Sequence, residues 1–163
     1  MKKLLCVFIC IVLFAGCEKP KDNENEFAEF YGFSACIKAT VNEINIVADA
    51  EYNLLNGLEI IVREPNSANG MIVKLKDGEC EINFHELSFS FISSGLLPNS
   101  PFIALERLAK SISTMKKHDN CYKFTCENET YYLYTNENAF YKLSTESDTI
   151  LFFENFKFDN VQT

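Results

Sequence analysis

The chain of 163 residues contains no tryptophan, and glycine and proline are scarce, with six and four residues. This scarcity excludes a collagen and a proline-rich disordered chain. Cations are outnumbered, because 15 lysines and arginines oppose 23 aspartates and glutamates, giving a formal charge of -8. Nucleic-acid-binding proteins normally carry a basic patch, so this sign argues against a nucleic-acid partner. By contrast, 47% of the residues are hydrophobic, which suffices for one globular core.

The N-terminal apolar run is too short to span a membrane. Residues 4–15 form it and follow Lys2 and Lys3, whereas a membrane-spanning helix needs about 20 apolar residues. A short apolar run behind a positive start is typical of an export signal. Phe14-Ala15-Gly16-Cys17 then resembles the lipobox of bacterial lipoproteins, with Phe14 where leucine is usual. The resemblance implies cleavage before Cys17 and a diacylglyceryl group on its sulfur.

This interpretation divides the chain into three parts. Residues 1–16 are a lipoprotein signal peptide, residues 17–29 a lipid anchor and polar tether, and residues 30–159 the folded domain. We expect an extracytoplasmic monomer held at the cell membrane by diacylglyceryl-Cys17, because two lipid chains anchor a protein stably. An ordinary secretory signal that happens to contain Cys17 is the alternative.

Four cysteines fall in the folded domain, namely Cys36, Cys80, Cys121 and Cys126. Strand alternation puts Cys36 on a polar face and Cys80 on an apolar face. Cys121 and Cys126 would lie about 17 Å apart on one regular strand, beyond the roughly 7 Å limit for a disulfide. Small buried hydrophobes are the favoured interpretation, while a pairing such as Cys80 with Cys126 stays open. Without a Cys-x-x-Cys pair or nearby histidines, we expect no metal site.

From residue 33 onward, apolar and polar residues alternate with a period of two. This period predicts strands with one face in water. The strands are expected near 33–41, 44–51, 58–63, 73–76, 80–85, 88–91, 121–126, 130–135, 139–144 and 149–153, with a last stretch at 156–158. Asp77-Gly78 between two alternating runs is a strong hairpin signal. Because the connections are short, neighbouring strands should pair antiparallel.

One helix is predicted at about 100–116. Ser100 suits the N-cap and Pro101 the first helical position, and apolar residues recur at three- and four-residue intervals from Leu105 to Met115. About ten strands make a sheet some 45 Å wide, which a helix about 24 Å long cannot cover. We therefore expect a mainly β (α+β) fold, a curled antiparallel meander or half-barrel with the helix on its concave side.

These features resemble the LolA-like and LppX-like lipoproteins, whose folds are open β-barrels with helices against the concave face. The resemblance covers residues 30–158 and is carried by the lipobox, the tether, the mid-chain helix and four local stretches. Those stretches are residues 58–65 with Gly70, residues 80–89, residues 97–101 and residues 153–158. Several members carry lipids or acylated proteins in an apolar cavity, so the resemblance implies such a ligand here.

The sequence gives little support for catalysis or for a cofactor. His85 falls on a polar strand face and His118 follows the helix, so both are interpreted as surface residues. The serines at positions 94 and 100 lack a partner base, and acid–base chemistry needs polar groups that converge in a pocket. We expect neither a catalytic residue nor a cofactor, and no enzymatic activity.

The candidate site is an apolar gap between sheet and helix. Eight residues could line it: Phe84, Phe89, Phe91, Leu105, Leu108, Ile112, Phe124 and Phe152. The hypothesis is non-enzymatic binding or carriage of an apolar or acylated ligand at the membrane surface. The alternative is that these residues pack together, leaving a structural or interaction lipoprotein with a solid core that docks another envelope protein through its acidic face.

Overall fold

A computed structural model describes residues 27, 30–96, 100–136, 139–146 and 148–159. The predicted signal peptide, Cys17 and most of the tether lie outside these residues. The elements in chain order are β1 (Gly32–Val41), β2 (Ile44–Asn53), β3 (Gly57–Glu64), η1 (Asn66–Ala68), β4 (Ile72–Lys76), β5 (Glu79–Phe84), β6 (Leu87–Ile92), η2 (Ser93–Gly95), α2 (Pro101–Ser111), η3 (Ile112–Thr114), β7 (Lys116–His118), β8 (Cys121–Cys126), β9 (Glu129–Asn136), β10 (Ala139–Ser144) and β11 (Thr149–Asp159).

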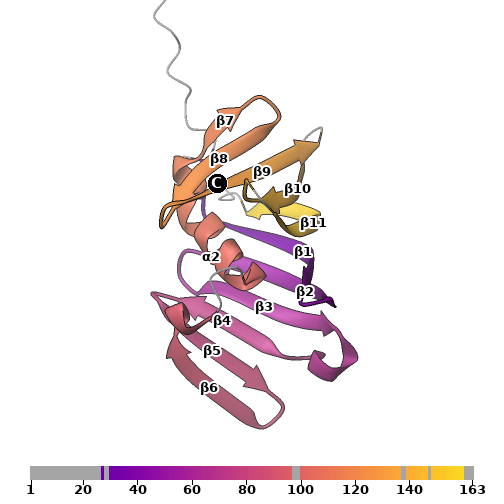
Figure 1. Cartoon of the computed structure of the whole chain (residues 1–163). Helices are drawn as coiled ribbons and strands as arrows, with labels where there is room; N and C mark the ends of the chain where they lie inside the picture. The colour runs from indigo at the N-terminus through magenta and orange to yellow at the C-terminus, as the bar shows by residue number, and fades with distance from the viewer. Residues whose placement is uncertain (1–26, 28–29, 97–99, 137–138, 147, 160–163) are drawn as a thin grey trace, which may run out of the picture.

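All the strands belong to one 11-stranded sheet, in the order β6-β5-β4-β3-β2-β1-β11-β10-β9-β8-β7. Every neighbouring pair is antiparallel. The sheet curls but does not close, and α2 lies against its middle (Figure 1). The predicted mainly β half-barrel with one principal helix is therefore confirmed.

The first and last strands of the chain are neighbours at the centre of the sheet. The first strand, β1, pairs with the last, β11, so Ile37 lies opposite Phe153 and Phe33 opposite Phe158. The two edges are then β6 and β7, which are joined through α2 (Figure 1). The opening of the half-barrel lies between these two edge strands.

Local chemistry explains the elements that the sequence predicted well. Asp77 and Gly78 both have positive φ angles, 52° and 85°, between the paired residues Lys76 and Glu79. This is the conformation of a two-residue hairpin loop, which aspartate and glycine tolerate. The hydroxyl of Ser100 accepts a hydrogen bond from the Phe102 backbone N–H at 3.3 Å, which caps the first turn of α2.

The helix is shorter than the predicted 100–116. It ends at Ser111, and a turn of 3-10 helix, η3, continues to Thr114. Residues 111–114 are serine, isoleucine, serine and threonine, which have low helix propensity. The Thr114 hydroxyl also donates to the Ser111 carbonyl at 2.9 Å, a local bond that competes with the helix. Lys116 belongs instead to β7, an edge strand that also contains His118.

The two faces of the sheet differ sharply in composition. The concave face carries the core, which includes Phe33, Ile37, Ile60, Leu75 and Leu133, each no more than 1% exposed. The convex face carries cross-strand ion pairs such as Lys74–Glu59 at 3.1 Å. Alternation along each strand produces this separation, as the sequence period predicted. Within the described part of the chain, no helix is both long and apolar enough to cross a bilayer.

Candidate functional site

Part of the concave face has no helix over it. On β5 and β6, five apolar residues extend the core outward: Ile82, Phe84, Leu87, Phe89 and Phe91. We call these residues the open strip. They share one face because cross-strand register pairs Ile82 with Phe89 and Phe84 with Leu87. That face is the concave one, since Cys80 opposite Phe91 is fully buried against the core.

The outer residues of the open strip are in contact with water. Leu87 is 59% exposed, Phe89 54% and Phe91 36%. On a strand at the edge of a sheet, one missing neighbour accounts for part of this exposure. The rest reflects the position of α2, whose main contacts are with β3, β8 and β11. The helix thus lies over the middle of the sheet and away from its β6 edge (Figure 1).

Four of the predicted lining residues lie instead where the helix meets the sheet. Leu105 and Leu108 are 0% exposed, Ile112 1% and Phe124 4%. A side chain that lines a water-sized gap would keep accessible surface, so these four pack directly against their neighbours. The structure therefore places them in the solid core under α2.

Phe152 lies apart from the other predicted lining residues. Its register partners are Lys38 on β1 and Lys142 on β10, whereas the neighbouring Phe153 lies opposite the core residue Ile37. Phe152 therefore points to the convex face, not into a gap between sheet and helix. The predicted set divides into Phe84, Phe89 and Phe91 on the open strip, four residues in the core, and Phe152 on the far side.

The opposite end of the concave face is filled by aromatic rings. Phe140 packs edge-to-face on Phe156, with ring centroids 5.0 Å apart, and Phe33 stacks on Phe156 at 5.1 Å. Phe27 closes this cluster through contacts with Tyr122 and Phe158. Such pairs add stability beyond their buried area. The curl of β8–β11 over β1 brings these rings together and leaves them little contact with water.

A polar cluster holds α2 toward this filled end. Nη1 of Arg107 on the helix donates to the hydroxyl of Tyr131 and to Oε2 of Glu129, the latter at 3.2 Å. Nη2 of Arg107 pairs with Glu127, and the Tyr131 hydroxyl donates to Glu129 at 2.5 Å. We call Arg107, Glu127, Glu129 and Tyr131 the Arg107 cluster. It ties the helix to the β8–β9 hairpin, far from β6 in the strand order.

Burial governs the titration of this cluster. Burial of Tyr131, together with its hydrogen bond to Glu129, raises its pKa to about 12. Burial disfavours the charged guanidinium of Arg107, but its bonds to Tyr131 and Glu127 outweigh this and raise its pKa. Arg107 stays charged and Tyr131 stays protonated at neutral pH. The contacts of Arg107 with Tyr131, Glu127 and Glu129 are therefore a structural tie between the helix and the β8–β9 hairpin.

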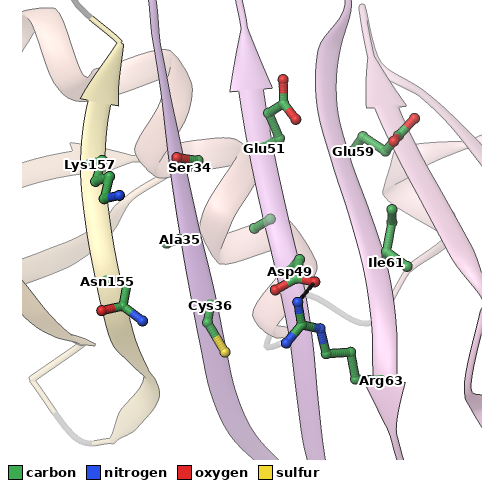
Figure 2. A pocket seen from close by; sticks show the side chains of 11 residues that line it. Ser34, Ala35, Cys36, Asp49, Glu51, Glu59, Ile61, Arg63, Asn155 and Lys157 are labelled. Carbon is green, nitrogen blue, oxygen red and sulfur yellow. Dashed lines mark ion pairs between the residues drawn. The ribbon is translucent and has the colours of Figure 1, made fainter.

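The convex face holds a shallow depression of about 360 Å³ across β11, β1, β2 and β3 (Figure 2). Its charged side chains are of both signs, and Arg63 pairs with Asp49 within it. The remaining lining includes Glu51, Glu59 and Lys157. These side chains are largely exposed and their charges partly cancel. The depression has the properties of a solvated sheet face, which binds small ligands poorly.

The thiol in this depression, Cys36, is a weak nucleophile. Burial raises its pKa, and the nearby carboxylates of Asp49 and Glu154 raise it further. Burial likewise raises the pKa of Cys80, Cys121 and Cys126. The thiolate is the reactive form, so burial makes these thiols less reactive. All four are free, so the alternative pairing of Cys80 with Cys126 is not formed.

The structure shows no metal site in the part of the chain that it describes. No group of three or more histidine, cysteine, aspartate or glutamate side chains there could hold a metal ion. His85 lies in the turn between β5 and β6 with a positive φ angle, and His118 ends β7; both are exposed. The Arg107 cluster was missed by sequence reasoning, because Arg107 stands beside Glu106 and near Lys110 on the helix and nothing local sets it apart as buried.

The chain was compared with family models, curated proteins and solved structures. No family model matches the chain, and no curated protein matches it. The crystal structure of a LolA superfamily protein from Nitrosomonas europaea is similar, with 11% sequence identity and a TM-score of 0.32. The match covers 82% of this chain and spans 66% of the length of that one. The assignment of the fold as a half-barrel rests on the strand order and the curl of the sheet.

Proposed function

We propose that this protein binds an apolar or acylated ligand on the open strip, and that it does so without catalysis. The observation that carries the proposal is the exposure of Leu87, Phe89 and Phe91 on the face that elsewhere forms the core. Contiguous exposed apolar residues mark binding surfaces in soluble proteins. Covering one such side chain is worth about 1.5–3 kcal/mol, which makes the open strip a favourable place for an acyl chain.

The surroundings of the open strip suit a hydrocarbon chain. No charged residue lies on β6, and the charged residues of β5, Glu79 and Glu81, alternate with the concave-face residues and so point to the convex side. An acyl chain lying on the strip therefore covers no charged side chain of β5 or β6. Ile82, the residue of the open strip on β5 that packs against the core, is half-buried.

We also propose that the chain is an extracytoplasmic lipoprotein anchored through Cys17. The support is the lipobox-like Phe14-Ala15-Gly16-Cys17 behind a short apolar run. An anchor would hold the open strip near lipid, the source of an acylated ligand. The test is Cys17→Ser, which should move the protein from the membrane fraction to the soluble fraction. If this variant is still cleaved yet stays with the membrane, lipidation is not what anchors the protein.

The binding test uses a fluorescent fatty acid and two matched variants. Phe89→Ser should weaken binding by about 10-fold or more, because one buried phenyl ring contributes on the order of 2 kcal/mol. The control is Phe152→Ser, since Phe152 is 49% exposed, close to the 54% of Phe89, but lies on the convex face. It should bind as the wild type does. Equal affinities in all three proteins, or no binding by the wild type, would reject the proposal.

One observation favours a second function. The tight packing of Leu105, Leu108, Ile112 and Phe124 means that the core under the helix is solid. A solid core suits a structural or interaction lipoprotein that docks another envelope protein. If the fatty acid fails to bind, this second function becomes the better account.

A further inference from the structure

The two edges of the sheet differ in how they are protected. The β7 edge is only three residues long and consists of Lys116, Lys117 and His118. Short, basic edge strands discourage pairing with other chains. The β6 edge has six residues, Leu-Ser-Phe-Ser-Phe-Ile, with no charge and no proline. Every residue of β6 is exposed, including Ile92 at 70%.

The outward backbone groups of β6 can be assigned from its pairing with β5. The Ser93 N–H donates to the Gly78 carbonyl at 2.8 Å. Hydrogen-bonded pairs alternate along an antiparallel ladder, so Phe91, Phe89 and Leu87 direct their backbone groups at β5. The N–H and C=O groups of Ser88, Ser90 and Ile92 therefore point away from the sheet, and no described strand pairs with them.

We infer that β6 pairs antiparallel with β6 of a second copy, making a two-fold homodimer with a continuous sheet. With the axis at Ser90, each Ser90 lies opposite the Ser90 of the other copy. Ser88 lies opposite Ile92 of the other copy, so all the outward backbone groups find partners. Phe89 lies opposite Phe91 of the other copy on the concave face, and aromatic cross-strand pairs stabilise sheets.

The charge pattern favours a second copy as the occupant. The chain carries a formal charge of -8, so two copies repel each other, and a self-contact needs a face whose local charges are balanced. At this end, strands β4–β6 hold Lys74 and Lys76 directly opposite Glu81 and Glu79, so the charges close to the edge compensate one another. The two-fold register brings no charged side chain opposite a like charge. Because β7 is protected, each chain offers one edge, and assembly stops at a closed dimer.

This inference does not depend on the proposed ligand, and it replaces the monomer expected from the sequence. In the dimer, the two open strips meet along β6 and form one apolar surface. Their concave sides remain open, so ligand binding and dimerisation can each succeed or fail alone.

The first test measures the mass of the full chain in mild detergent by sedimentation equilibrium. The wild type should reach twice the 18.6 kDa chain mass. Ser90→Glu should weaken the dimer on the order of 100-fold, because it places two carboxylates opposite each other. The matched control is Thr125→Glu, an exposed hydroxyl on β8, which should remain dimeric. Circular dichroism checks that both variants fold.

The second test is a disulfide scan of the register. In Ser90→Cys, the two introduced thiols lie on residues whose Cα atoms are about 5.5 Å apart, within bridging range, so oxidation should give a covalent dimer above the wild-type background. In Ser88→Cys the two positions lie more than about 13 Å apart and should not bridge. A wild type that is monomeric at its highest soluble concentration overturns the inference. So does a dimer that Ser90→Glu leaves intact, or one that bridges equally well through both cysteine variants.

Discussion

The two ends of the concave face are built from strands of the same kind but meet water differently. At the β8–β11 end, the sheet curls over the aromatic cluster of Phe33, Phe140 and Phe156, and the Arg107 cluster draws α2 toward it. At the β4–β6 end, the open strip continues the apolar pattern, but Leu87 and Phe89 stay more than half exposed. The strand pattern is therefore the same at both ends, and the position of one helix decides which end is core and which is available surface.

The largest expected effect comes from deleting the same side chain at each end. Leu108→Ala should lower the free energy of unfolding by about 3 kcal/mol, because Leu108 is fully buried and its loss leaves a cavity. Leu87→Ala should cost less than about 1 kcal/mol, because Leu87 is already 59% exposed. Urea denaturation measures both. Equal losses would mean that the two ends do not differ in packing.

The next largest loss of stability is expected from breaking the contacts that hold α2 to the β8–β9 hairpin. Arg107→Met should cost about 2 kcal/mol, because it leaves the buried Tyr131 hydroxyl and Glu129 without their cationic partner. Arg63→Met is the matched control, since the Arg63 side chain is 61% exposed in its pair with Asp49. It should change stability by less than about 0.5 kcal/mol. A small effect at Arg107 would show that the cluster does not hold the helix.

The same cluster should make stability fall at alkaline pH. The pKa of Tyr131 is raised from 10.0 to about 12 in the folded protein. Between these values the unfolded chain has lost the phenolic proton while the folded chain retains it, so stability is full below pH 10 and declines up to about pH 12. The loss is on the order of 2 kcal/mol. Tyr131→Phe should show a shallower decline in urea melts over this range, and parallel declines would contradict the assignment.

The smallest effect is expected on the convex face of β3 and β4. Lys74→Ala removes the pair with Glu59, but the side chains of Lys74 and Glu59 are 47% and 44% exposed. Exposed pairs contribute little, so stability should change by less than about 0.5 kcal/mol in the same urea assay. A loss above about 1.5 kcal/mol would show that the Lys74–Glu59 pair contributes more to stability than an exposed ion pair should.

Local patterns explain why much of the fold could be predicted. Alternation identified the strands and put Cys36 on the polar face, where it lies opposite Asp49 and Glu154. The Asp77-Gly78 hairpin and the Ser100 cap depend on residues within a few positions of each other. Such short-range chemistry is fully visible in the sequence.

What could not be predicted depends on distant contacts or on ambiguous runs. Residues 150–153 are all apolar, so the alternation does not say which of Phe152 and Phe153 faces the core. The pairing of β1 with β11 has no local signal, and neither does the bond between Arg107 and Tyr131. The candidate site shows the same division between local and distant effects. Strand alternation predicts which face Phe89 and Phe91 occupy, but their exposure depends on where the helix lies.

The central claim, that the open strip is the ligand surface, is tested most directly by photolabelling. A fatty acid with a diazirine at the end of its chain is irradiated with the full chain, and the labelled peptides are mapped by mass spectrometry. The account predicts label within residues 79–92 that unmodified fatty acid displaces. Label concentrated in β8–β11, or label that fatty acid cannot displace, would contradict it.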